Sequence, residues 1–299
     1  MIRTRWREAA AGYALSAPFL VLLGAFVIYP IVYAFRLSFQ DFSYLVPQEA
    51  RWIGLDNYRH LLHDPTFRKA MRNTLLLTAI VVPTQTLLAL LLANALSAKI
   101  RARGLFRTLY FLPYVVAPIA VGAVMVDLFG PGGLVTRALH AALSTPAGAW
   151  YTQPSYAFVL VVIVLIWSQL GFFTLLYLAG LQAISPSVYE AARIDGASSL
   201  QILRKITIPL LRPMTFLVVV MGVIISLQVF EQPYAISTTG GALPGSPAGA
   251  TLTMVMYLYT QAFRYFDMGS ASAAAFVVFV LIVFFAILQA LQQRRARSR

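Results

Sequence analysis

Long apolar runs without charged residues alternate with short polar segments along this chain of 299 residues. A hydrocarbon core of about 30 Å takes about 20 helical residues to cross, so each such run is long enough for a transmembrane helix. We expect six spans, at about residues 10–37, 73–98, 108–129, 155–182, 213–234 and 268–292. The pattern therefore predicts an all-α integral membrane protein that forms a single domain over residues 1–299.

Two segments between the runs do not predict spans. The uncharged stretch 232–263 is interrupted by Gly and Pro between residues 240 and 247, which leaves about 251–263 for a helix too short to cross. We expect this helix to lie at the membrane interface, with Tyr257, Tyr259 and Phe263 among its anchors. The segment 40–72 mixes aromatic and charged residues and predicts either a small folded cap or an interfacial helix.

Prolines interrupt several of the apolar runs. A proline removes a backbone donor, so each of them predicts a kink or a broken helix end where neighbouring groups satisfy the freed carbonyl. The alternative is that they reflect only the higher frequency of proline in membrane helices. The residues concerned are Pro18, Pro30, Pro83, Pro113, Pro118 and Pro233.

Composition and charge support this class and add an orientation. Hydrophobic residues make up 60% of the chain, charged residues 11%, and the mean hydropathy is +0.76, which excludes an ordinary soluble domain. The net charge of +13 does not indicate nucleic acid, because the basic residues cluster between the apolar runs. Residues 1–9, 99–107, 193–212 and 294–299 hold 15 of the 23 basic residues, so we expect both termini in the cytoplasm.

Catalytic and metal chemistry are not indicated. There is no cysteine, and none of the three lysines completes a phosphate-binding P-loop. His60 and His63 lie three residues apart but have no evident third ligand. The sequence therefore predicts a protein that is not an enzyme and binds no metal or cofactor of its own.

The segment 185–209, between the fourth and fifth runs, predicts two short helices joined by a glycine turn. Pro186 suits the start of the first helix, and Ser187 with Glu190 matches a capping box. Gly196 suits the end of that helix. Ser198 or Ser199 can cap the second helix, which we expect to run to about residue 207, where prolines 209 and 213 stop it. We call this segment the elbow.

The elbow resembles the permease subunits of binding-protein-dependent ABC importers. Their motif reads E-A-A, three residues, G, nine residues, then I-x-L-P. The matching residues are Glu190, Ala191, Ala192, Gly196, Ile206, Ile208 and Pro209, with Ile208 in place of leucine. The resemblance implies that the elbow, Asp195 included, docks on a separate cytoplasmic ATPase that binds ATP and Mg. For Glu190, capping its own helix and pairing with a basic ATPase residue both remain open.

A second resemblance concerns the first half of the chain, which is similar to the first permease of carbohydrate importers of the maltose, trehalose and glycerol 3-phosphate type. The segments that carry it are Tyr29-Pro30-Ile31, Ser38-Phe39, the run 53–58 and Asn73-Thr74-Leu75. The outer stretch 230–242 is also similar, but its ending departs from the family pattern at residues 242–244.

What these resemblances imply is a type I ABC importer in a bacterial or archaeal cytoplasmic (inner) membrane. This chain would form half of a pathway for a mono-, di- or oligosaccharide or glycerol phosphate. Its implied partners are a second homologous permease, an ABC ATPase dimer and an extracytoplasmic sugar-binding protein, besides membrane lipid. The alternatives are an ABC permease for another small polar solute, or a secondary transporter.

Polar side chains at membrane depth are costly and are therefore candidates for contact with a solute. Hydrogen bonding between helices is the alternative explanation for the polar ones, and packing for the tryptophan. The candidates for the substrate pathway are Gln85, Trp167, Gln169, Gln228, Glu231 and Tyr234.

Overall fold

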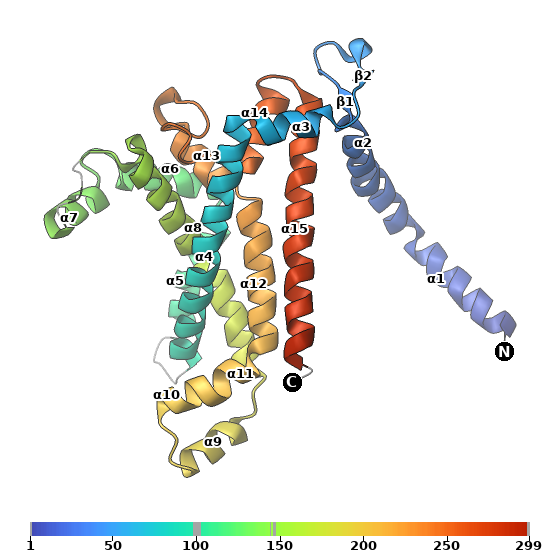
Figure 1. Ribbon diagram of the computed structural model, residues 1–299. Helices are drawn as coiled ribbons and strands as arrows, with labels where there is room; N and C mark the ends of the chain where they lie inside the picture. The colour runs from blue at the N-terminus through green and yellow to red at the C-terminus, as the bar shows by residue number, and fades with distance from the viewer. Residues whose placement is uncertain (1, 98–102, 144, 146–147, 298–299) are drawn as a thin grey trace. The chain divides into compact units, whose positions relative to one another are not determined.

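The computed structural model describes residues 2–97, 103–143, 145 and 148–297, and most of them are helical (Figure 1). These residues form two compact units, one of residues 1–64 with 258–277 and one of residues 65–257 with 278–299. Five helices are long and apolar enough to cross a membrane, and a bent pair of helices makes up to six. The expected all-helical membrane protein is thereby confirmed.

The first unit contains a long apolar helix followed by a small folded cap. Its elements are α1 (Ile2–Leu23), the π-helix η1 (Gly24–Ile28), α2 (Tyr29–Leu37), β1 (Gln40–Asp41), the 3₁₀-helix η2 (Pro47–Glu49), β2 (Arg51–Trp52) and α3 (Asp56–His63). The side-chain amide of Asn57 ties the cap together, since it donates to the carbonyls of Ser38 at 3.0 Å and Gln40 at 2.9 Å. Of the two alternatives predicted for residues 40–72, the structure has a small folded cap over residues 40–63, whereas residues 65–72 already belong to the next helix.

The second unit holds most of the remaining helices. They are α4 (Pro65–Ser97), α5 (Arg103–Val115), α6 (Pro118–Leu128), α7 (Leu134–Leu143), η3 (Trp150–Thr152), α8 (Pro154–Gln182), α9 (Pro186–Ile194), α10 (Ser199–Ile202), η4 (Leu203–Thr207), α11 (Ile208–Leu210), α12 (Arg212–Leu227), α13 (Glu231–Ser237) and η5 (Thr239–Gly241). α14 (Met254–Phe263) and α15 (Met268–Arg297) each cross from one unit into the other.

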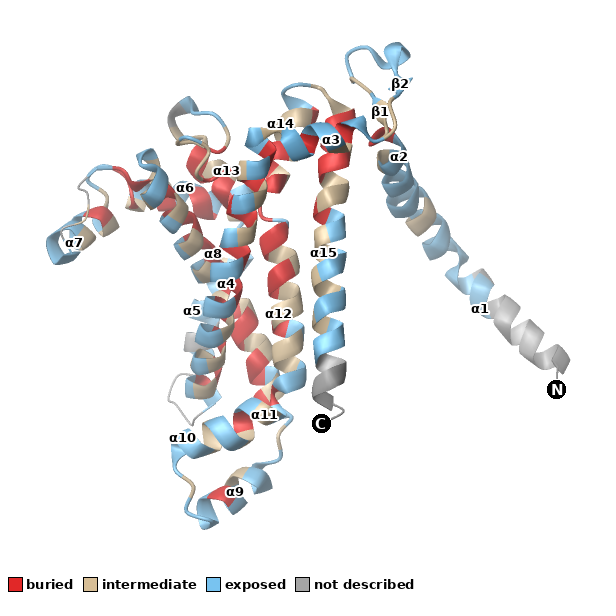
Figure 2. Ribbon diagram, viewed as in Figure 1, coloured by how far each residue is buried: buried red, intermediate tan, exposed pale blue. Residues whose placement is uncertain are grey.

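α8 is the centre of the second unit, and Figure 2 shows how much of it is buried. It packs along α4 through fully buried residues such as Leu77, Val81, Leu160 and Val164. On another side α8 meets α5 at Gly171, where an added Cβ would lie 2.0 Å from the carbonyl oxygen of Tyr110. Only glycine permits this close approach of the two backbones.

The expected third and fifth spans each consist of two helices, and the break before Pro118 in the third is one of the predicted broken helix ends. α5 and α6 are bent by 105° at the break before Pro118, which starts α6. α12 ends at Leu227 and α13 starts at Glu231. Pro118 cannot donate a backbone hydrogen bond, so the helix restarts there, whereas Pro18, Pro83 and Pro113 lie inside helices.

The predicted interfacial role of Tyr257 is wrong. α14 does form within the expected range, but Met254 and Met256 are fully buried and Tyr257 is only 2% exposed. The ring of Tyr257 packs edge-on against Phe67 of α4, with the centroids 5.2 Å apart. Tyr257 is therefore buried inside the protein and is not available as an anchor at the membrane interface. Phe263 is 60% exposed and remains a predicted anchor.

Asn73 of α4 holds the segment before α14 in place. Its side-chain amide donates to the carbonyls of Gly249 at 2.8 Å, Ala250 at 3.2 Å and Leu252 at 3.1 Å. Because Asn73 is 4% exposed, its loss leaves these acceptors with little access to water.

We expect Asn73→Ala to lower the free energy of unfolding by about 2 kcal/mol, measured by thermal unfolding in detergent. Asn73→Asp keeps the side-chain size but places a carboxylate against three carbonyls, so it should destabilise at least as much. An unchanged melting temperature in both variants would contradict this role.

Candidate functional site

A cavity of about 380 Å³ opens where the two broken helices face α8. α5 ends and α6 begins on one side of it, and α12 gives way to α13 on another. The lining residues are Pro113, Tyr114, Val116, Pro118, Val121, Ser168, Gln169, Ile225, Gln228, Val229, Phe230, Glu231 and Gln232. We call this space the broken-helix cavity. Irregular backbone at membrane depth is tolerated where it lines such a space.

Three of the six predicted pathway residues line the broken-helix cavity. Gln169 comes from the middle of α8 and is 7% exposed, Gln228 follows the end of α12, and Glu231 starts α13. They lie 59 and 3 positions apart in sequence, so the tertiary structure brings them together.

The other three predicted pathway residues do not line it. Gln85 is 1% exposed on α4, and its Oε1 has no hydrogen-bond partner among the described residues. Trp167 is 44% exposed and lines a separate, mainly apolar cavity of about 470 Å³. Tyr234 is half-buried on α13, with its ring 5.0 Å from that of Phe230.

Sequence reasoning missed three lining residues with polar groups, namely Tyr114, Ser168 and Gln232. Ser168 and Gln232 are next to predicted residues in the chain, so adjacency was the available signal. In the sequence, nothing distinguishes Tyr114 from the other aromatic residues near it. In the structure, its ring stacks on that of Phe172, with the centroids 4.7 Å apart. The cavity thus combines amides, hydroxyls, one carboxylate and aromatic rings.

The second candidate site is the elbow, whose turn has a complete C-terminal helix cap. The backbone amide of Ala197 donates to the carbonyl of Ala192 at 3.0 Å, and that of Gly196 donates to Arg193 at 3.1 Å. Gly196 has a φ of +74°, the left-handed conformation that glycine adopts at least cost. The predicted glycine turn is therefore present in the structure.

The capping of the elbow helices differs in part from the sequence prediction. The predicted capping box of Ser187 and Glu190 is wrong, because α9 starts after Ser185 and has no side-chain cap. The Oγ atoms of Ser185 and Ser187 instead lie 2.8 Å apart. A capping box is present at α10, between Ser198 and Gln201. Ser198 is thus the N-cap of α10, which confirms one of the two predicted alternatives, Ser198 or Ser199.

Pro209 does not stop the second elbow helix, which corrects the expected end near residue 207. The chain passes through the π-helical turn η4 and continues as α11 to Leu210. A π-helical turn widens the backbone, which accommodates a residue without an amide hydrogen. The direction changes only at Leu211, before α12.

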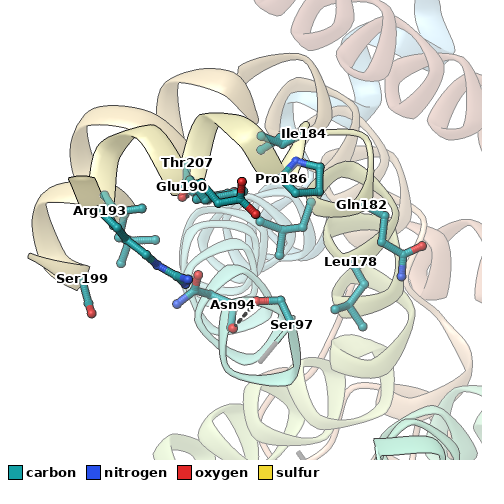
Figure 3. A pocket seen from close by; sticks show the side chains of 14 residues that line it. Asn94, Ser97, Leu178, Gln182, Ile184, Pro186, Glu190, Arg193, Ser199 and Thr207 are labelled. Carbon is teal, nitrogen blue, oxygen red and sulfur yellow. Dashed lines mark hydrogen bonds between the residues drawn. The ribbon is translucent and has the colours of Figure 1, made fainter. Parts of the chain in front are cut away.

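A cavity of about 690 Å³ separates the elbow from the ends of α4 and α8 (Figure 3). Glu190 and Arg193 of α9 line it on one side, with Asn94 of α4 and Gln182 of α8 among the residues opposite. Within the elbow, the hydroxyls of Tyr189 on α9 and Thr207 on η4 are 3.5 Å apart.

The elbow also presents exposed surface. Ile194 is 86% exposed and Leu200 is 55% exposed, whereas Ala192 is buried at 7%. Ala191, Asp195 and Gly196 are exposed. Ile194 and Leu200 are thus apolar side chains that the described residues leave uncovered.

Comparison with known proteins defines the class of this chain. Residues 85–298 match the model of the family described as binding-protein-dependent transport system inner membrane component. The chain belongs to this family, which confirms the resemblance of the elbow. It is a multi-pass permease of the inner membrane and not an enzyme.

Relatives that match nearly the whole length of the chain indicate a narrower group within this family. The chain is 36% identical over 291 residues to the lactose transport system permease protein LacF of Rhizobium radiobacter, covering 96% of this chain and 94% of the relative. It is 31% identical to the trehalose/maltose transport system permease protein MalF of Thermococcus litoralis, covering 95% and 94%. Its fold matches a chain of a solved bacterial importer of the acidic polysaccharide alginate, with a TM-score of 0.84 at 22% identity and 98% coverage of both.

Proposed function

We propose that this permease forms half of the translocation pathway for a carbohydrate, with the broken-helix cavity as its solute-facing wall. The cavity itself supports this best, because amides and hydroxyls that bond sugar hydroxyls stand beside aromatic rings that pack on sugar C–H faces. Relatives named for lactose, arabinooligosaccharides and trehalose/maltose support the same substrate class. Within the predicted pathway set, Gln169, Gln228 and Glu231 are the residues that we assign to the solute.

We further propose that residues 185–209 dock on a cytoplasmic ABC ATPase dimer that binds ATP and Mg. The exposed Ile194 and Leu200 and the rigid turn at Gly196 support a docking surface of defined shape. Glu190 is exposed and caps no helix through its side chain, which favours pairing with a basic ATPase residue. With the elbow inside, both termini are cytoplasmic, as the distribution of basic residues predicts.

The remaining partners are a second homologous permease and an extracytoplasmic sugar-binding protein. The second permease is supported by the family resemblance, which implies that this chain supplies half of the pathway and a homologous chain the other half. One solved relative of the fold is an alginate transporter in complex with a pentasaccharide-bound periplasmic protein, which supports the second partner.

The test is to purify the tagged chain from its native membranes in mild detergent and identify the co-purifying proteins by mass spectrometry. The expected result is a second permease and an ABC ATPase, followed by ATP-dependent sugar uptake after reconstitution with the binding protein. A chain that purifies without them, and transports without ATP, would overturn the proposal.

Gln169→Leu should reduce sugar uptake about tenfold or more without reducing the amount of assembled protein. The change keeps the approximate volume of a nearly buried side chain but removes both of its hydrogen-bonding groups, each of which contributes about 1 kcal/mol. Uptake of radiolabelled sugar in membrane vesicles measures it. Trp167→Phe, outside the cavity, is the control and should retain most of the uptake.

A further inference from the structure

The broken-helix cavity carries negative charge in a strongly basic protein. Glu231 is the one Asp, Glu, Lys, Arg or His among its lining residues, and it is exposed rather than buried. The chain as a whole has a net charge of +13. The overall excess of basic residues would predict a basic lining, so the acidic residue in the cavity does not follow from the composition of the chain.

The helices that form the cavity place their basic residues far from it. α8 contains no charged residue, and the basic residues of α5 and α12 lie at the ends opposite the two breaks, at Arg103, Arg107 and Arg212. Arg212 precedes Ile225 of the lining by 13 positions, which is about 20 Å along a helix. That distance is too long for Arg212 to pair with a carboxylate in the lining.

The two restarting helices carry only acids. α6 contains Asp127 and α13 contains Glu231, and neither helix contains a lysine or an arginine. They pack closely, since a Cβ on Gly122 of α6 would lie 2.6 Å from the Cβ of Ala235 in α13. The pair is thus a locally anionic element beside the cavity.

We propose that Glu231 makes this half of the pathway selective for neutral sugars over anionic ones such as uronates, sulfonated sugars and sugar phosphates. A carboxylate accepts hydrogen bonds from two neighbouring hydroxyls of a neutral sugar. An anionic group placed there meets a like charge with no lining cation to compensate it. The inference rests on the proposed sugar pathway, and it narrows the predicted substrates by excluding glycerol phosphate.

The absence of cysteine from the chain allows the charge selectivity to be measured without knowing the sugar. We would introduce Gln228→Cys, an exposed lining position three residues from Glu231, into the complete transporter in membranes. The rates of its reaction with an anionic and a cationic methanethiosulfonate reagent are then compared. We expect the cationic reagent to react about tenfold faster, and the added Glu231→Gln to remove most of that preference.

Leu143→Cys provides the control, because this residue is 69% exposed at the end of α7 and does not line the cavity. Its ratio of rates should not change with Glu231→Gln. Equal rates of the two reagents at Gln228→Cys, or a ratio that Glu231→Gln leaves unchanged, would overturn the inference.

Measurements of sugar uptake distinguish a failure of this inference from a failure of the proposed function. With Glu231→Gln, uptake of sugar phosphates and uronates should rise at least tenfold relative to neutral sugars of the same ring size, measured in vesicles with the binding protein at saturation. A wild-type transporter that takes up both kinds equally would overturn the charge selectivity but leave the sugar pathway standing. A transporter that takes up no sugar of either kind would overturn the proposed function itself.

Discussion

Gly171→Ala should prevent the second unit from folding correctly, with the loss of most correctly folded protein from the membrane. The added Cβ would lie 2.0 Å from the carbonyl oxygen of Tyr110 and 2.6 Å from its carbonyl carbon, and both atoms belong to the backbone of α5. Backbone atoms cannot rotate away as a side chain can, so α5 and α8 must separate along their length. We expect a cost of at least 3 kcal/mol, which is typical of severe overpacking in a core.

The measurement is the yield of monodisperse protein in detergent and its melting temperature. Two glycines give matched controls. Gly104→Ala on α5 meets nothing within 4 Å and should be neutral. Gly180→Ala on α8 meets the side chains of Leu211 and Met214, which can move, so its effect should be intermediate. A Gly171→Ala protein as stable as the Gly104→Ala protein would contradict the close crossing.

Gly196→Pro should leave the protein inserted but uncouple ATP hydrolysis from uptake, reducing uptake about 100-fold. Proline fixes φ near −65°, whereas Gly196 has a φ of +74°. It also removes the amide hydrogen that Gly196 donates to the carbonyl of Arg193. The turn between α9 and α10 must therefore change direction, and the docking surface changes with it.

Uptake and ATPase activity of the reconstituted complex are measured together. Gly196→Asn is the matched variant, because asparagine adopts the left-handed conformation at modest cost, and it should keep most of the coupling. No added Cβ would meet another atom within 4 Å at this position, so any loss reflects backbone conformation and not a steric clash. Normal uptake by the Gly196→Pro protein would contradict the coupling role of the elbow.

The elbow shows which details a sequence can and cannot predict. Gly196 and Ser198 act locally, through a left-handed turn and a capping box that involve residues within five positions; the glycine turn is predicted, and Ser198 is one of two predicted caps. The predicted cap at Ser187 and the predicted stop at Pro209 are wrong, because α9 starts after Ser185 and the chain stays helical past Pro209 after a π-helical turn.

The candidate cavity was predictable only in part. Gln169, Gln228 and Glu231 were found because polar residues stand out in apolar runs, and the same signal selected Gln85 and Trp167, which lie elsewhere. Hydrophobic periodicity places a residue along a helix, but it does not say which neighbouring helix that residue faces. Tyr114 shows the converse, since an aromatic residue among others gives no signal of its own.

The sequence alone determined the membrane class, the places of the spans and the position of the elbow. These follow from the length of uncharged runs, the distribution of basic residues and short-range turn chemistry, all of which act along the chain. The sequence also indicated a break at Pro118, but only the tertiary structure decided its angle of 105°, the burial of Tyr257 against Phe67, and the meeting of Gln169 with Gln228 and Glu231 in one cavity. The physical reason is that packing between helices depends on contacts between residues far apart in the chain, such as Phe67 and Tyr257, which no local pattern encodes.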